Sequence, residues 1–151
     1  MILVSSCLAG INCKYSGANN LVPSIRDLVN EGKAIPICPE QLGGLTTPRV
    51  PAEIVRDTKG KIRVVTKDGK DVTKEYILGA ERALAVAKAL GVKMAILQRR
   101  SPSCGCGVVY DGTFTKCLID GNGITAELFI KNGIKVFSDE NYLKQSFNDQ
   151  V

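Results

Sequence analysis

The chain has 151 residues, of which 44% are hydrophobic, so a single domain spanning residues 1–151 can bury one continuous core. No apolar run approaches the ~18 to 20 residues that a membrane span needs, and the first residues lack the basic segment of a secretion signal, so we expect a cytoplasmic protein without membrane contact. The net charge of +5, from 20 basic and 15 acidic residues, does not predict a nucleic-acid partner, because basic and acidic residues alternate from 56 to 75 and Trp is absent.

Short apolar runs alternate with helical patterns along the chain, which is typical of βαβ units around a parallel sheet. Residues 1–4 predict the first strand, and a helix that begins at Pro23 and ends at Gly32 precedes a second strand at residues 34–37. Residues 39–51 are rich in proline and glycine, and we expect them to form a shaped loop with no helix or strand.

The middle of the chain predicts a hairpin, a long helix and a third strand. Residues 54–55 and 62–66 are expected to pair, and Thr73 is predicted to cap the helix that follows. The apolar face of this helix is predicted at five positions with helical spacing: Ile77, Ala80, Leu84, Ala87 and Leu90. Residues 94–97 predict the third parallel strand, and residues 101–107 predict a loop.

The last third predicts a second hairpin around residues 110–112, with Cys117 packed inside it. Thr125 is expected to cap the next helix, residues 134–137 predict a fourth strand, and Ser138 is expected to cap a terminal helix. Right-handed crossovers then predict a Rossmann-like α/β fold, with a parallel sheet of about four strands, helices on both faces and small hairpin insertions.

Three cysteines follow three of the predicted strands. Cys7 lies just beyond the first strand, Cys38 ends the second, and Cys104 lies in the loop after the third. Because the carboxyl ends of parallel strands share one edge, where ligands bind, we expect these cysteines to form one site. Six cysteines exceed the needs of a core, and a reducing cytosol argues against disulfides, so metal binding or thiol chemistry is the leading interpretation.

The spacing and number of the cysteines favour an iron-sulfur cluster over zinc. The chain has no histidine and no C-x-x-C motif, only the C-x-C pair of Cys104 and Cys106. Three thiolates at strand ends suit a 4Fe-4S cluster, which four thiolates normally hold, and leave one iron without a protein ligand. Cys13 is close enough to Cys7 to reach the site, and Cys106 competes with Cys104, so the ligand set stays open on this reasoning.

Polar residues near these cysteines can handle protons or contact a ligand. Glu40 stands two residues after Cys38, and Ser101 and Ser103 stand beside Cys104. Glycines let a backbone approach a ligand closely, and an arginine can contact an anion or a carbonyl unless it is a surface residue. The candidates for these ligand contacts are Gly43, Gly44 and Arg49.

Five blocks of sequence, in order, resemble the thiouracil desulfidase family of small bacterial and archaeal domains. They are S-S-C-L-A-G at 5–10, K-Y-S-G at 14–17, C-P-E-Q-L-G-G-L at 38–45, P-R-V-P-A-E-I at 48–54 and S-P-S-C-G at 101–105. The resemblance covers nearly the whole chain. It implies a 4Fe-4S cluster with three cysteine ligands, Cys7, Cys38 and Cys104, and one open iron that binds the sulfur of the substrate.

The resemblance also implies a reaction and roles for the other residues. It implies non-redox desulfuration of a thiolated base such as thiouracil, in which Glu40 activates water and Ser101 or Ser103 stabilises or protonates the developing anion. Tyr15, which belongs to the K-Y-S-G block, is expected to contact the substrate. Ser16 stands where many relatives have Asp, which puts a substrate contact at that position in doubt.

Three other classes of protein remain compatible with the sequence. They are a sulfur-transfer or thiolation protein that uses the same cluster, a zinc or thiol redox protein, and a cluster-dependent RNA-binding module. Iron with acid-labile sulfide would argue against the zinc protein, and sulfide release without reductant would argue against the redox and binding proteins. The sequence indicates neither the exact thiolated base nor the oligomeric state.

Overall fold

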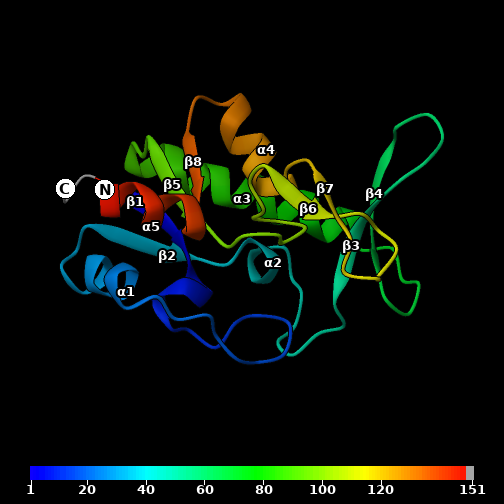
Figure 1. Cartoon of the computed structure of the whole chain (residues 1–151), viewed down its shortest axis with the longest axis horizontal. Helices are drawn as coiled ribbons and strands as arrows, with labels where there is room; N and C mark the ends of the chain where they lie inside the picture. The colour runs from blue at the N-terminus through cyan, green and yellow to red at the C-terminus, as the bar shows by residue number, and fades with distance from the viewer. Residues whose placement is uncertain (149–151) are drawn as a thin grey trace.

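The computed structural model of the chain describes residues 1–148, and within them four parallel strands form one sheet (Figure 1). The strands are β1 (Ile2–Ser5), β2 (Ala34–Ile37), β5 (Met94–Leu97) and β8 (Lys135–Ser138), in the order β2-β1-β5-β8. In the register of the sheet, Ile2 lies opposite Ala34, and Met94 lies opposite Lys135. The predicted α/β fold is confirmed, and the first and last strands each begin and end one residue later than expected.

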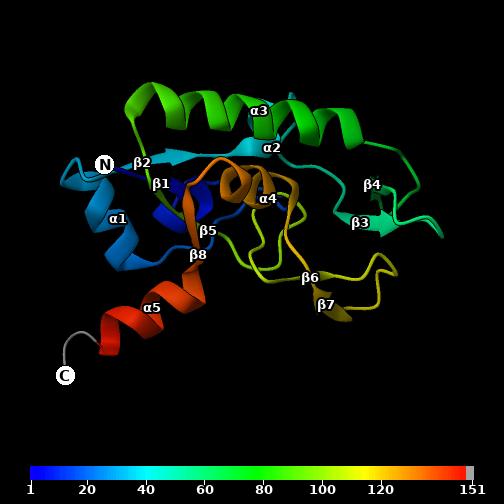
Figure 2. The ribbon, with the colours of Figure 1, turned by 90° about the horizontal axis from the view of Figure 1, so that it is seen from above.

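Helices cover both faces of the sheet, as expected (Figure 2). One face carries α1 (Pro23–Asn30) and α5 (Asp139–Asn148), and the other carries α3 (Thr73–Leu90) and α4 (Ile124–Lys131). Because successive side chains of a strand point to opposite faces, Leu3 and Val4 belong to two separate core clusters. The chain leaves β1 for β2 on one side and later returns to β5 on the other, so the switch point, where such sheets bind ligands, lies between β1 and β5.

Two antiparallel hairpins stand beside the sheet in the described residues 1–148 (Figure 1). They consist of β3 (Ala52–Arg56) with β4 (Ile62–Thr66), and of β6 (Val108–Tyr110) with β7 (Leu118–Asp120). Cys117 is exposed just before β7, whose residues are all exposed as well, so the prediction that it packs inside this hairpin is wrong. No helix within residues 1–148 is long and apolar enough to cross a membrane.

Two expectations for the helices are wrong in detail. Residues 39–51 contain a short helix, α2 (Pro39–Leu42). Proline fits the first turn of a helix, because an N–H group at that position would have no hydrogen-bond partner within the helix. The buried residues of α3 are mostly small: Tyr76, Gly79, Ala80, Ala83 and Ala87. Ile77 and Leu90, predicted for the buried face, are each 45% exposed. Small side chains, rather than the largest apolar ones, therefore decide which face of α3 packs.

The helix caps also differ from the predictions in two of three cases. Val72 and Gly123 occupy the capping positions of α3 and α4, and neither helix has a side-chain cap. Thr73 instead donates its hydroxyl proton to Asp71 at 2.6 Å, and Thr125 is buried inside α4. The predicted cap of the terminal helix is confirmed, since the Oγ of Ser138 accepts the backbone N–H of Asn141 at 3.1 Å.

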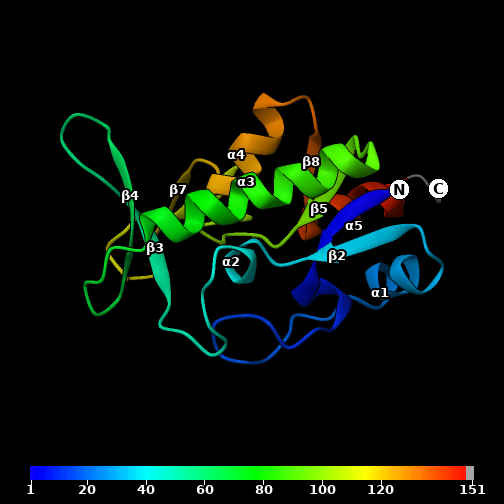
Figure 3. The ribbon, with the colours of Figure 1, turned by 180° about the vertical axis from the view of Figure 1, so that it is seen from behind.

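Two glycines let α2 and α3 cross in backbone contact (Figure 3). A Cβ atom at Gly43 would lie 2.0 Å from the carbonyl oxygen of Glu75, and one at Gly79 would lie 1.9 Å from that of Pro39. Any larger residue at either position would push the helices apart. The close crossing carries Tyr76 of α3 to the edge of the sheet where the strands end.

We expect Gly79→Ala to lower the free energy of unfolding. Alanine in place of glycine in an open helix stabilises by about 1 kcal/mol, whereas overpacking a tight contact costs about 1 to 3 kcal/mol, and the 1.9 Å approach makes the second effect decide. Urea denaturation of Gly79→Ala and of the exposed control Lys88→Ala measures this difference. A Gly79→Ala protein as stable as the native chain would show that α2 is not pressed onto α3.

Candidate active site

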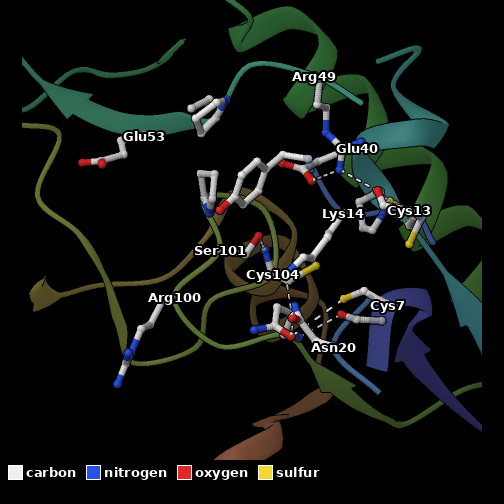
Figure 4. A pocket seen from close by; sticks show the side chains of 18 of the residues that line it. Cys7, Cys13, Lys14, Asn20, Glu40, Arg49, Glu53, Arg100, Ser101 and Cys104 are labelled. Atoms are coloured by element: carbon white, nitrogen blue, oxygen red, sulfur yellow. Dashed lines mark hydrogen bonds and ion pairs between the residues drawn. The ribbon is translucent and has the colours of Figure 1, made fainter. Parts of the chain in front are cut away.

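A cavity of about 470 Å³ opens where β1, β2 and β5 end. It is lined by Cys7, in the short 3-10 helix Ser6–Ala9, and by Cys104, in the loop after β5 (Figure 4). Cys38, directly after β2, lines it as well. The three cysteines predicted from the strand ends thus share one cavity. All six cysteines of the chain are free thiols in the structure.

A fourth cysteine, Cys13, lines the same cavity and is only 2% exposed. The Cys38 thiol donates to the carbonyl oxygen of Cys13 at 3.9 Å, so these two residues are neighbours in the cavity. The remaining two cysteines of the described chain do not line the cavity: the thiol of Cys106 points to the carbonyl oxygen of Val136 at 3.6 Å, and Cys117 is exposed. Cys106 therefore does not compete with Cys104 for a place in this cavity.

The pKa values of three thiols in this cavity, those of Cys13, Cys38 and Cys104, are raised above the ordinary value of a thiol. Burial is the main reason that the pKa of Cys104 rises to about 12. A hydrogen bond with Ser5 lowers this pKa, and the negative charge of Glu40 raises it. The hydrogen bond with Cys38 lowers the pKa of Cys13, but the hydrogen bond with Cys7 and burial outweigh it, and the pKa rises to about 11. A metal that binds here displaces these protons.

Glu40 is held by two side chains, one at each carboxylate oxygen. Arg49 donates from Nη2 to Oε2 at 2.6 Å, and the Tyr76 hydroxyl donates to Oε1. The Arg49 side chain is only 7% exposed. Burial lowers the pKa of Arg49, but the negative charge of Glu40 and the hydrogen bond to Glu40 raise it, and the pKa is raised overall. Burial and the Glu40 charge both raise the pKa of Tyr76, so the phenol stays a proton donor. Because a carboxylate has about four acceptor positions, Glu40 can still accept a proton from water.

Arg49 also ties together the loops around the cavity. Its Nη2 donates to the carbonyl oxygen of Cys13 at 2.9 Å, and its Nη1 donates to the carbonyl oxygen of Thr46 and the hydroxyl of Thr47. Its Nε is buried and has no hydrogen-bond partner within the described residues. Arg49 is therefore a buried structural arginine that retains one free donor, and the alternative of a surface arginine is excluded.

The two predicted serines have different surroundings. Ser101 lines the cavity, and its Oγ accepts the backbone N–H groups of Ser103 at 3.1 Å and Cys104 at 3.0 Å, which leaves its own proton free to donate. Ser103 is 1% exposed, lies 2.8 Å from the hydroxyl of Thr125, and does not line the cavity. Its carbonyl oxygen accepts the N–H groups of Thr125 and Ala126 in the first turn of α4, so Ser103 fixes the Cys104 loop to that helix.

The predicted substrate contacts divide in the same way. Tyr15 lines the cavity and is half exposed, so it can reach a ligand. Gly43 and Gly44 do not line it among the described residues. Gly43 allows α2 to pack closely against α3. Gly44 has a φ of 91° in the turn that ends α2, and glycine is the residue that adopts this conformation most readily.

Three residues that the sequence analysis missed complete the site. The Gln98 side-chain oxygen accepts from the Cys7 thiol at 3.8 Å and from the Asn20 amide at 3.1 Å, and Tyr76 holds Glu40. Gln98 directly follows β5, so the argument from strand ends could have found it. Asn20 in a polar loop and Tyr76 inside a helix carry no such signal.

Basic side chains outnumber carboxylates around the cavity. The acidic residues that line the cavity are Glu40 and Glu53, and the basic ones are Lys14, Arg49, Lys67, Arg99, Arg100 and Lys116. Glu53 accepts the backbone N–H groups of Gly112 and Phe114, and it lies with Arg100 on the side away from the labelled cysteines (Figure 4). The positive charge favours anionic groups, including a cluster bound by several thiolates.

The cysteines fit a cluster better than a single metal ion. Within residues 1–148, no three cysteine, aspartate or glutamate side chains are close enough together to hold one ion. An iron-sulfur cluster instead takes each thiolate on a different iron, so its ligands line a cavity, as these thiols do. Several thiols around one cavity are thus a donor set that fits an iron-sulfur cluster.

The chain is similar in sequence and fold to known proteins. A family model described as 2-thiouracil desulfurase matches residues 2–141. The chain is 48% identical over 144 residues to the uncharacterized protein YbbK of Bacillus subtilis (strain 168), a match that covers 92% of this chain and 95% of that protein. The solved structure of the 4Fe-4S-dependent thiouracil desulfidase TudS is similar, with a TM-score of 0.83 and 41% identity over 97% of each chain.

Proposed function

Because the chain belongs to the 2-thiouracil desulfurase family, we propose that it removes the sulfur of thiouracil with water, in a non-redox reaction that depends on a 4Fe-4S cluster. The products are sulfide and the oxygenated base. The observation that carries this proposal is the cavity in which cysteines from three strand ends meet Glu40. The sulfur-transfer and RNA-binding alternatives do not account for a partly buried carboxylate held beside these thiols.

Cys7, Cys38 and Cys104 hold the cluster in this proposal. Each follows a different strand of the sheet, so the three thiols approach the cavity from separate, rigid elements. When bound, a cluster with one iron free of protein thiolates supplies a soft Lewis acid for the sulfur of a thiocarbonyl group. The free thiols also support the proposed cytoplasmic location.

Glu40 takes the proton of the attacking water. Arg49 and Tyr76 hold its carboxylate from both sides, so its remaining acceptor positions have a fixed direction. A base that is already oriented loses no freedom when water binds, which favours proton transfer in the transition state.

Ser101 donates its free hydroxyl proton to the anion that develops on the base, and Ser103 contributes by fixing the loop that carries Ser101. Tyr15 and Arg49, which both line the cavity, are the proposed contacts to the base itself. The proposed partner is thus a small thiolated base.

Sulfide release tests the proposed function. The anaerobically reconstituted protein, incubated with 2-thiouracil and 4-thiouracil in separate reactions without reductant, is expected to release sulfide from at least one of them. A protein that carries a full cluster and releases none would rule out the desulfurase function.

Exposure to air is expected to remove iron and activity together, since an iron without a permanent thiolate is open to oxidants and is lost from the cluster. Iron content and sulfide release are measured on the same sample before and after exposure. Activity that persists once the iron is gone would contradict the role of the cluster.

A further inference from the structure

Four thiols, one more than the proposed ligand set, line the cavity in the described chain. The fourth, Cys13, is as deeply buried as the residues of the hydrophobic core, and the Cys38 thiol donates to its carbonyl oxygen at 3.9 Å. Cys13 therefore lines the same cavity as the three proposed ligands and lies next to one of them. A cysteine that served only the core would not need to face this cavity.

The backbone of Cys13 is held in place from the side of Glu40. Its carbonyl oxygen accepts from Arg49 at 2.9 Å and from the Thr47 hydroxyl at 3.5 Å, and Arg49 binds Glu40 at the same time. Its N–H donates to the carbonyl oxygen of Ile11 at 2.9 Å. Cys13 is thereby fixed on the side of the cavity where Glu40 meets the attacking water.

We propose that Cys13 is a fourth, exchangeable thiolate ligand that occupies the iron intended for the substrate while no substrate is bound. This inference rests on the proposed function and adds a resting state to it. When a thiolated base enters, its sulfur replaces the Cys13 sulfur on that iron, and the released thiolate takes a proton from solvent. No electron is transferred, and the proton leaves again when Cys13 rebinds after the product sulfide departs.

The exchange has two measurable consequences. With Cys13 bound, the fourth iron is shielded from oxidants and is lost more slowly. Substrate also competes with Cys13, and the apparent dissociation constant rises by the inverse of the competent fraction, so a form that is about nine-tenths capped binds substrate about tenfold more weakly.

The first experiment measures loss of the fourth iron. Native protein, Cys13→Ala and the matched control Cys106→Ala are reconstituted anaerobically, their iron and acid-labile sulfide are quantified, and they are oxidised with limiting ferricyanide. Electron paramagnetic resonance then follows the three-iron cluster. All three proteins are expected to begin with four irons, and Cys13→Ala is expected to form the three-iron cluster several-fold faster than the other two.

The second experiment measures binding of 2-thiouracil to the same proteins, where Cys13→Ala is expected to bind about tenfold more tightly. Equal iron loss and equal affinity in the three proteins would overturn the inference and leave the desulfurase function standing. A Cys13→Ala protein that takes up no cluster would overturn the exchange as well, because Cys13 would then be a permanent ligand. Failure of the native protein to take up a cluster would instead refute the proposed function. If Cys13→Ala does not fold, Cys13→Ser replaces it in both measurements.

Discussion

Cys38→Ala is expected to abolish cluster binding and desulfurase activity together. Cys38 directly follows β2, and it lines the cavity together with Cys7 and Cys104, which follow the two neighbouring strands. Removal of one of three permanent thiolates leaves a second iron without a protein ligand, and such a cluster is not retained. The same loss is expected for Cys7→Ala and Cys104→Ala.

Iron content and absorbance after anaerobic reconstitution measure this effect, and Cys117→Ala is the matched control because its thiol is exposed and away from the cavity. Circular dichroism establishes that each variant is folded. A full cluster in Cys38→Ala would contradict the ligand assignment. Loss of the cluster in Cys117→Ala would show that the second hairpin takes part in the site.

Glu40→Gln is expected to lower turnover roughly 10²-fold or more while the cluster stays bound, because the usual contribution of a general base is lost. The substitution also leaves the buried Arg49 charge without its partner, which can cost about 3 to 5 kcal/mol of stability. Activity is therefore compared at a temperature where denaturation curves show the variant to be folded. Iron content, thiouracil binding and sulfide release are measured on the same sample.

Tyr76→Phe is the control for this variant, since it removes one hydrogen bond to Glu40 and keeps both the carboxylate and Arg49. Its turnover is expected to fall by less than that of Glu40→Gln. A colourless Glu40→Gln protein would mean that Glu40 supports the cluster, and near-normal sulfide release would mean that another group activates water.

The strands could be predicted from the sequence because each is a short apolar run bounded by polar or glycine-rich segments. Residues 34–37 and 94–97 were predicted with the bounds that β2 and β5 have. The orientation of α3 could be predicted only in part: Ala80, Leu84 and Ala87 face the core as expected, whereas Ile77 and Leu90 are exposed. The apolar residues of α3 are too many to fit on one face of the helix. The close crossing with α2 at Gly79 buries the side that carries small residues and leaves Ile77 exposed.

The candidate site also has a part that could be predicted from the sequence and a part that could not. Its cysteines and Glu40 could be placed because each stands at or near the end of a strand, and the order of a parallel sheet brings such positions together. The partners of Glu40 could not. Tyr76 is a helical residue that reaches the cavity only because α2 and α3 touch, and Arg49 reaches it through the fold of a loop. These contacts depend on packing between segments distant in sequence.

The origin of the new oxygen atom in the product tests the account most directly. The anaerobically reconstituted protein is incubated with 2-thiouracil in water enriched in oxygen-18, without reductant, and uracil is analysed by mass spectrometry while sulfide is quantified. The account predicts that one oxygen-18 atom enters each uracil formed and that sulfide appears in equal amount. Uracil without the label, or sulfide release only when a reductant is added, would contradict it.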